Sequence, residues 1–453
     1  YQFDTENPDE IYGKGSKIKL ADETSRHEYM CSFCGHLYET GAQLKEDLGK
    51  NGCEKLFKDI EMPLSYVLFE MEKNGVCVNQ GILDEIAKKN LVKIDECTKH
   101  IYELAGHEFN VNSPKQLAVV LYDELGLKAG KKRSTAVDVL EKLRFQHPII
   151  DEILKQRKYQ KLYSTYAVGL VKHIQSDGKI HTTFHQCLTT TGRLSSSDPN
   201  LQNISVRDED GKEIRKAFVA SEGCVLVSAD YSQIELRMLA HMAHVDKMID
   251  AFKHNADIHT ETAMNIFHVK KEEVTSLMRR QAKAVNFGIV YGMSAFGLSE
   301  QLNISPKEAK DFIDRYFETY PNIQKFMNQC VEECEQKGYV TTLFNRKRYI
   351  PEIHDKNYMV REFGKRAAMN APIQGSSADL IKVAMNNIHQ KMEEKGCKSK
   401  MILQIHDELI FDVPQDEVEL MKKLVSYEME HAMELSVPLK AEASVSHNWY
   451  EAK

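Results

Sequence analysis

The chain has 453 residues, enough for about three average domains or for one multi-lobed body. Hydrophobic residues make up 42% of it and charged residues 28%, a composition that excludes a disordered chain. The net charge of −7 excludes binding of nucleic acid through an overall positive charge, so such a function must depend on local charge.

The sequence gives no sign of membrane insertion or export. No apolar run reaches the ~20 residues that a bilayer-spanning helix needs. The first residues, YQFDTENPDE, do not resemble a signal peptide. We therefore expect a cytoplasmic protein with no membrane partner.

Residues 1–57 are polar, mixed in character and short for a catalytic domain. They contain Asp4, Thr5 and Glu6, whose DxE pattern matches the start of a proofreading nuclease site. The segment leaves too little chain for the other metal-binding carboxylates and their sheet. We expect it to be inactive; if it degraded mismatched ends, a labelled primer would shorten without nucleotides.

Helices dominate the next part of the chain. An apolar-periodic helix from Ile60 leads to a strand-like GVCVN, and residues 81 to about 175 are expected to form long helices. One of these starts at Ser113 and Pro114, a polar cap followed by proline, and stops at Gly126.

A basic patch follows within this acidic chain. The loop from Lys128 to Thr135 is rich in Lys and Arg. A helix from Pro148 to about Ile174 then places further cations within two turns, namely Arg157, Lys158 and Lys161. We expect these three side chains to contact a phosphate backbone.

Two acidic residues stand at the ends of apolar, strand-like runs. Asp230 closes the run GCVLVSAD, and Asp407 lies between MILQI and LIFDV, beside Glu408. Each aspartate alone suggests a solvated turn. Together they match phosphoryl transfer, in which two Mg²⁺ ions about 3.5 to 4 Å apart are held by few carboxylates.

A cationic helix is expected between these two acids, from Arg279 to Tyr291. Arg279, Lys283, Phe287 and Tyr291 recur every four residues and share one face. The apolar residues at 282, 285, 289 and 290 supply a separate packing face. A nucleoside triphosphate fits this gradient from cationic to aromatic: Arg279 would grip the γ-phosphate, and Lys283 would give a proton to the pyrophosphate.

The segment TTTGRLSSSDPNLQNIS, residues 189–205, has the composition of a loop. It also carries hydrogen-bond donors that could reach the minor-groove acceptors common to every correct base pair. These donors are Arg193, Asn200, Gln202 and Asn203.

Four motifs together carry a resemblance. They are TGRLSSSDPNLQNI (191–204), DYSQIELR (230–237), RRQAKAVNFGIVYG (279–292) and QIHDEL (404–409). With them, residues 58–453 resemble the family A DNA polymerases, within these the large fragment of the bacterial DNA polymerase I group. The resemblance implies an α+β right-hand fold: a palm with an antiparallel sheet, helical fingers and thumb, and a short N-terminal remnant of a 3′→5′ exonuclease domain.

The same resemblance implies domain bounds and partners. The exonuclease remnant would span 1–57; the polymerase domain would comprise palm 58–81, 176–250 and 351–453, thumb 82–175 and fingers 251–350. The partners would be primer-template DNA and dNTPs, bound by a monomer. The cofactor would be two Mg²⁺ ions, with Mn²⁺ as a substitute, and the role DNA replication and repair.

Residue roles follow from the resemblance as well. Metals would be held by Asp230, Asp407 and the carbonyl of Tyr231, with Lys283 and Glu408 as further catalytic residues. The dNTP would contact Arg279, His259, Gln233, Glu235, Phe287 and Tyr291, with Glu235 excluding a ribose 2′ hydroxyl. DNA would contact Arg193, Asn200, Gln202, Asn203, Asn370, Gln374, His406, Arg157, Lys158 and Lys161.

Two alternatives remain open from the sequence. A single-subunit RNA polymerase of related architecture would prefer UTP over dTTP, and Glu235 argues against it. A catalytically idle module that holds primed duplex would bind DNA without releasing pyrophosphate.

Overall fold

The computed structural model describes residues 8–13, 19–128, 133–205 and 208–452. At its centre lies a four-stranded antiparallel sheet in the order β10-β5-β9-β8. Its strands are β5 (Cys224–Tyr231), β8 (Lys400–Ile405), β9 (Glu408–Pro414) and β10 (Ala441–Ser446). This confirms the expected strand that ends at residue 230 and the expected strand pair around residue 407. Strand β5, which carries residue 230, is the neighbour of β9, which starts directly after residue 407.

Within the described residues, three two-stranded antiparallel pairs accompany the central sheet. They are β1 (Val76–Cys77) with β2 (Lys179–Ile180), β3 (Thr183–His185) with β4 (Ser195–Ser197), and β6 (Tyr339–Thr341) with β7 (Lys347–Tyr349). Short 3₁₀ turns lie at Glu213–Ala217, Lys271–Glu273, Pro351–His354 and Gln415–Glu417.

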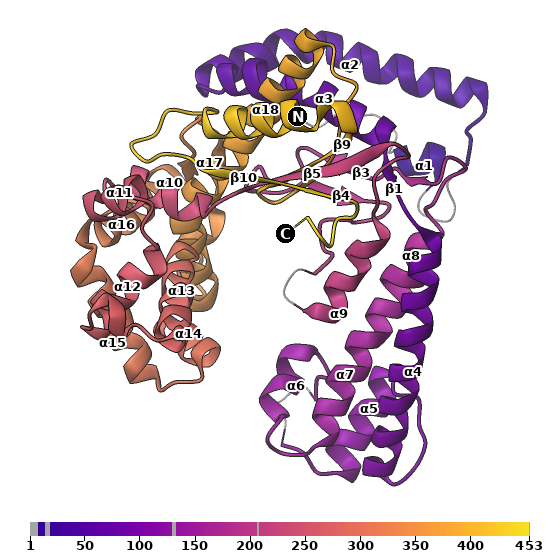
Figure 1. Ribbon diagram of the computed structural model, residues 1–453, viewed down its shortest axis with the longest axis vertical. Helices are drawn as coiled ribbons and strands as arrows, with labels where there is room; N and C mark the ends of the chain where they lie inside the picture. The colour runs from indigo at the N-terminus through magenta and orange to yellow at the C-terminus, as the bar shows by residue number, and fades with distance from the viewer. Residues whose placement is uncertain (1–7, 14–18, 129–132, 206–207, 453) are drawn as a thin grey trace.

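Helices cover the central sheet and form one lobe with it. Helices α3 (Met62–Asn74) and α18 (Val418–Glu430) pack on the sheet. Helix α17 (Tyr358–Lys395) packs against these two helices. After β5, the chain forms the helical lobe on the left of Figure 1. It comprises α10 (Ile234–Met242), α11 (Asp246–Lys253), α12 (Ile258–Phe267), α13 (Ser276–Val290), α14 (Ala295–Leu302), α15 (Pro306–Thr319) and α16 (Pro321–Lys337). One continuous hydrophobic core joins this lobe to the sheet.

A second helical lobe, at the lower right of Figure 1, has a core of its own between Ile101 and Ile153, while Leu83 and Leu170 near its base belong to the main core. It comprises α4 (Gln80–Ala105), α5 (Pro114–Val119), α6 (Val137–Leu143), α7 (Ile149–Lys161) and α8 (Val168–Val171), with π-helical turns at Val120–Glu124 and Leu162–Ala167. The Ser113 hydroxyl accepts a bond from the Gln116 amide, as expected for the cap of α5, and Gly126 has a φ of 63°. The short helix α9 (Glu209–Lys212) lies between this lobe and the sheet.

The N-terminal segment forms α1 (Pro8–Tyr12) and α2 (Glu23–Lys50), followed by a π-helical turn at Leu56–Glu61. No residue of α2 is buried. The DxE pattern at residues 4–6 and most of the basic loop after Lys128 fall outside the described residues. Among the helices that are described, none is both long and apolar enough to cross a membrane. The nuclease-remnant assignment stays a prediction.

Candidate functional site

The two aspartates meet at one end of the central sheet. Asp230 is the penultimate residue of β5 and pairs with Glu408 of β9, and Asp407 directly precedes Glu408. The Tyr231 amide donates a hydrogen bond to the carbonyl of Asp407 at 3.2 Å. Both aspartate side chains are half-buried. The antiparallel register therefore brings together two carboxylates that lie far apart in the sequence.

Glu408 is held inside the core below this carboxylate pair. Its Oε1 accepts from the Ser228 hydroxyl at 2.6 Å and from the Trp449 indole at 3.3 Å. Arg215 approaches its Oε2 to 3.8 Å and stacks over the Trp449 ring. Burial lowers the pKa of Arg215, while Glu408 and Asp230 oppose that shift. The sequence did not single out Arg215, which places a buried positive charge beneath the acidic pair.

The donor set at this point suits a hard divalent cation. Asp230 and Asp407 offer carboxylate oxygens, and Tyr231 directly follows Asp230 at the end of β5. In the described parts of the chain, no three His, Cys, Asp or Glu side chains converge as a metal site. Few protein ligands are typical of Mg²⁺, which keeps several waters and takes phosphate oxygens.

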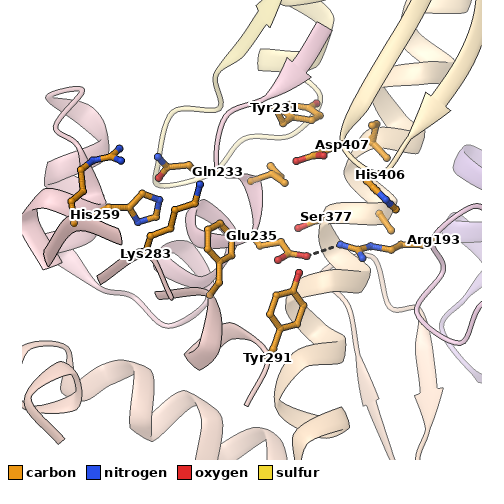
Figure 2. A pocket seen from close by; sticks show the side chains of 15 residues that line it. Arg193, Tyr231, Gln233, Glu235, His259, Lys283, Tyr291, Ser377, His406 and Asp407 are labelled. Carbon is orange, nitrogen blue, oxygen red and sulfur yellow. Dashed lines mark hydrogen bonds and ion pairs between the residues drawn. The ribbon is translucent and has the colours of Figure 1, made fainter. Parts of the chain in front are cut away.

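A cavity of about 450 Å³ opens beside the aspartates. Figure 2 shows His259 and Lys283 on one side of it and Asp407, His406 and Arg193 on the other. The sequence-predicted residues that line it are Arg193, Tyr231, Gln233, Glu235, His259, Arg279, Lys283, Phe287, Tyr291, His406 and Asp407. Asp407 and the cations Arg279 and Lys283 thus face a common space, and Asp230 lies next to Asp407 without lining this space.

Helix α13 forms one wall of this cavity. Ala282, Val285, Ile289 and Val290 are buried, as the predicted packing face requires. Lys283 is exposed, and its amine lies 6.0 Å from the centre of the Phe287 ring. The helix ends at residue 290, so Tyr291 is its C-terminal cap. The cationic-to-aromatic gradient therefore faces the cavity.

Arg279 has a partner that the sequence did not predict. Its Nε donates to Asp257 Oδ2 at 2.5 Å. Asp257 is the N-cap of α12 and also accepts from the His259 amide and the Thr260 hydroxyl. Burial raises the pKa of Asp257, but the bond from Arg279 and the other two bonds together lower it to about 2. An aspartate directly before the apolar start of a helix was the signal that could have identified this cap.

His259 is a neutral donor at the cavity wall. Burial lowers its pKa to about 4, opposed by Asp257 and assisted by Lys283. The Asn286 amide lies 3.0 Å from His259 Nδ1, and the Thr262 hydroxyl donates to the amide oxygen. Asn286 therefore offers its NH₂ group to Nδ1, which leaves the proton on Nε2.

Glu235 lines the cavity and is held in place by Arg193. It is 7% exposed, and Arg193 Nη2 lies 2.6 Å from its Oε1 (Figure 2). Tyr291 adjoins the pair; burial first and the Glu235 charge second raise the pKa of Tyr291 to about 12. The tyrosine is consequently a neutral hydroxyl near pH 7.

The loop around Arg193 rests on a buried ionic cluster that the sequence did not reveal. Arg346 bonds both Glu61 and Asp379, and Lys382 reaches Glu61 at 2.8 Å. A Cβ added at Gly192 would meet Arg346 Nε at 2.5 Å, and the φ of Gly192 is 81°. Close approach of backbone to guanidinium thus requires glycine immediately before residue 193.

One predicted donor of this loop already has partners within the protein. Gln202 is buried, and its amide donates to the carbonyl and the side-chain oxygen of Gln404, each at 3.1 Å. Gln404 in turn donates to the His406 carbonyl, and His406 is exposed with a φ of 57°. Gln202 therefore supports the turn below His406, because its amide is already satisfied there.

Four other residues predicted to contact DNA do not line the cavity. Asn200 and Asn203 are exposed. Asn370 of α17 donates to the carbonyl of Val290 at 3.1 Å, at the last residue of α13, and Gln374 is half-buried on α17. Asn370 thus ties α17 to the end of the cationic helix.

The predicted cations of α7 are arranged differently. Lys158 Nζ lies 2.7 Å from Asp208 Oδ1 and 2.5 Å from Asp210 Oδ2. Arg157 donates to the carbonyl of Thr135, and Lys161 is exposed. Two of the three expected phosphate contacts are therefore already used within the protein, because folding brings acceptors to them.

Comparison with known proteins agrees with this geometry. Residues 80–451 match the model of DNA polymerase family A. DNA polymerase I of Lactococcus lactis subsp. cremoris is 50% identical over 450 residues, 98% of this chain and 51% of that relative. The Bacillus subtilis and Geobacillus stearothermophilus DNA polymerases I are 50% and 48% identical over 98% and 100% of this chain. The chain spans about half the length of these relatives.

A solved structure is similar over nearly all of the chain. It is the POL domain of Pol1 from M. smegmatis in complex with DNA primer-template and dNTP. The TM-score is 0.89 at 38% identity, over 98% of this chain and 79% of that one. The expected α+β right-hand polymerase fold is thereby confirmed. By fold and by sequence, the chain belongs to DNA polymerase family A.

Proposed function

We propose that this chain is a DNA-templated DNA polymerase that extends a primer 3′ end with dNTPs and releases pyrophosphate. One observation carries the proposal: Asp407, next to Asp230, faces Arg279 and Lys283 across one cavity. The bacterial relatives named DNA polymerase I support it. We further propose a role in replication and repair in the bacterial cytoplasm.

In this proposal, the lobes are the palm, fingers and thumb subdomains of a polymerase. The sheet with residues 58–81, 176–250 and 351–453 is the palm, residues 251–350 are the fingers and residues 82–175 are the thumb. The core that palm and fingers share, and the separate cluster of buried residues between Ile101 and Ile153 in the thumb, support this division. Residues 1–57 are proposed as the inactive exonuclease remnant.

The cationic wall binds the triphosphate. Arg279 offers a guanidinium to the terminal phosphate, and His259 Nε2–H adds a neutral bond that needs no proton uptake near pH 7. Lys283 lies one helical turn further on and gives a proton to the departing pyrophosphate. Gln233 lines the same cavity. The aromatic end of the wall, with Phe287 and Tyr291, faces the sugar and the base.

Glu235 selects the sugar. Because it is buried and fixed by Arg193, its carboxylate cannot swing away from a ribose 2′ hydroxyl. On the DNA side, the proposed contacts are Arg193, Asn200, Asn203, Asn370, Gln374, His406 and Lys161.

Asp230, Asp407 and the Tyr231 carbonyl would hold two Mg²⁺ ions, or Mn²⁺ in their place. When bound, such ions lower the pKa of the primer hydroxyl and neutralise charge on the phosphates. The protein contributes the two fixed carboxylates, and the buried Arg215 and Glu408 beneath them keep the strand ends in register.

A primer-extension assay with Mg²⁺ and dNTPs tests the proposal. Asp407→Asn removes one charge at constant shape and should slow extension about 10³-fold, since several kcal/mol of charge stabilisation are lost. Asp416→Asn, an exposed aspartate of the 3₁₀ turn after β9, is the matched control and should extend at the parent rate.

Three outcomes would contradict the proposal. Parent-rate extension by the Asp407 variant would remove the carboxylate pair from the reaction. Preference for rNTPs would indicate an RNA polymerase. Binding of primed duplex without pyrophosphate release by the unmodified chain would indicate an idle binding module.

A further inference from the structure

Asp257 stands behind Arg279 relative to the proposed nucleotide cavity. Arg279 and Gln233 line both that cavity and a second one of about 330 Å³. Asp257 lines the second cavity and is absent from the wall of the first. The carboxylate therefore holds the guanidinium from the far side, where it does not itself meet a nucleotide.

The bond uses one edge of the guanidinium. Asp257 Oδ2 accepts from Nε at 2.5 Å. Nη1 and Nη2 thus stay available for an anion on the cavity side, in the fork geometry that matches phosphate oxygens. Both side chains are about half or one-third exposed, so the pair contributes little to folding stability. Its main effect is on the direction of a long, flexible side chain.

The same carboxylate also sets the position of His259. As N-cap of α12, Asp257 accepts from the His259 amide at 3.1 Å and from the Thr260 hydroxyl at 2.8 Å. Arg279 lies on α13 and His259 on α12, and both line the nucleotide cavity. One acidic side chain therefore links the two groups that would bind the phosphate tail.

We propose that Asp257 is a positioning residue, which orients Arg279 toward the terminal phosphates of the bound nucleotide. This inference rests on the proposed polymerase function. It predicts the direction in which nucleotide affinity changes when the charge of Asp257 is removed. Repulsion alone would make a negative charge near a triphosphate weaken binding. A positioning role requires the opposite: removing the charge must weaken nucleotide binding.

The test is Asp257→Asn, assayed by single-nucleotide incorporation over a range of dNTP concentrations. Asparagine caps a helix as well as aspartate does, so α12 should keep its start. The charge-assisted hold on Arg279 is lost, and an unrestrained side chain must be ordered by each nucleotide. The KM for dNTP should rise roughly three- to tenfold, with a smaller change in kcat.

Two comparisons make the result decisive. Asp314→Asn removes a carboxylate paired with Lys310 on α15, outside both cavities, and should leave KM unchanged. In an Arg279→Ala background, Asp257→Asn should cause no further rise, since its effect passes through Arg279. An independent rise there would overturn the inference.

An unchanged or lowered KM in Asp257→Asn would also overturn the inference, because electrostatic repulsion alone predicts lowering. A thermal midpoint of Asp257→Asn within a few degrees of the parent would show that this variant is folded. If Asp257→Asn does not fold, Asp257→Glu, which keeps the charge, should bind dNTP with part of the parent affinity. Failure of the unmodified chain to extend primers would refute the polymerase function itself, which is a distinguishable result.

Discussion

Helices α13 and α7 both carry cations at helical spacing, yet the structure uses them differently. Lys283 is exposed on the wall of the large cavity and has no ion pair with the described residues. Lys158 lies between Asp208 and Asp210, about fifty positions away in the chain. The comparison shows that a basic pattern identifies charge, whereas the acceptors that folding brings to it decide whether that charge is available to a ligand.

The loss of Lys283, the exposed cation of α13, should slow primer extension strongly. Lys283→Ala should lower kcat for primer extension about 10²- to 10⁴-fold, the usual contribution of a general acid. Lys283→Arg keeps the positive charge but holds its proton too tightly, so it should restore nucleotide binding more than rate.

Arg280→Ala is the control for this prediction. Arg280 is an exposed cation of the same helix that does not line the cavity, and its loss should change kcat less than twofold. If Lys283→Ala extended primers as fast as this control, the distinction between α13 and α7 would fail.

A second prediction concerns the buried His259 and the pH dependence of the free energy of unfolding. The folded pKa of His259, about 4, lies below its ordinary 6.5, so the unfolded chain binds more protons between these values. The stability from neutral His259 is complete above pH 6.5 and is lost as the pH falls toward 4. The loss by pH 4.5 should be roughly 2 to 3 kcal/mol.

Urea unfolding at pH 7.5 and pH 4.5 measures this contribution. The fall in unfolding free energy should be smaller in His259→Gln than in the unmodified chain, since glutamine does not titrate. His254→Gln, at an exposed position after α11, should behave like the parent. Equal falls in all three proteins would show that His259 is not desolvated.

A third prediction, of a modest change in DNA affinity, distinguishes two lysines of α7. If Lys161 meets a DNA phosphate, Lys161→Ala should reduce the slope of log affinity against log salt by about 1. Lys158→Ala should leave that slope unchanged and cost folding about 0 to 1 kcal/mol, as for other partly exposed pairs. An equal slope change in both variants, measured by primed-duplex titration, would show that DNA displaces the two aspartates.

Local pattern was a good guide to the elements that carry the site. The run that ends at Asp230, the cap at Ser113 and the buried face of α13 follow from alternation, cap chemistry and helical period. These signals reach over a few residues, so the chain itself contains them.

Long-range partners were beyond such signals. The bond of Asp257 to Arg279, the inward turn of Gln202 and the cluster around Arg346 depend on which segments become neighbours. A donor read as available from the sequence can thus be satisfied inside the protein, as Gln202 and Lys158 are.

The chemical groups of the site follow from the amino-acid order: two acids at strand ends, a cationic-to-aromatic helix and the motifs that identify the family. The tertiary structure alone decided which charges face a common cavity, which are neutralised and which are held in position. The reason is physical, because hydrogen bonds and ion pairs act over a few ångströms in space, and sequence separation does not set that distance.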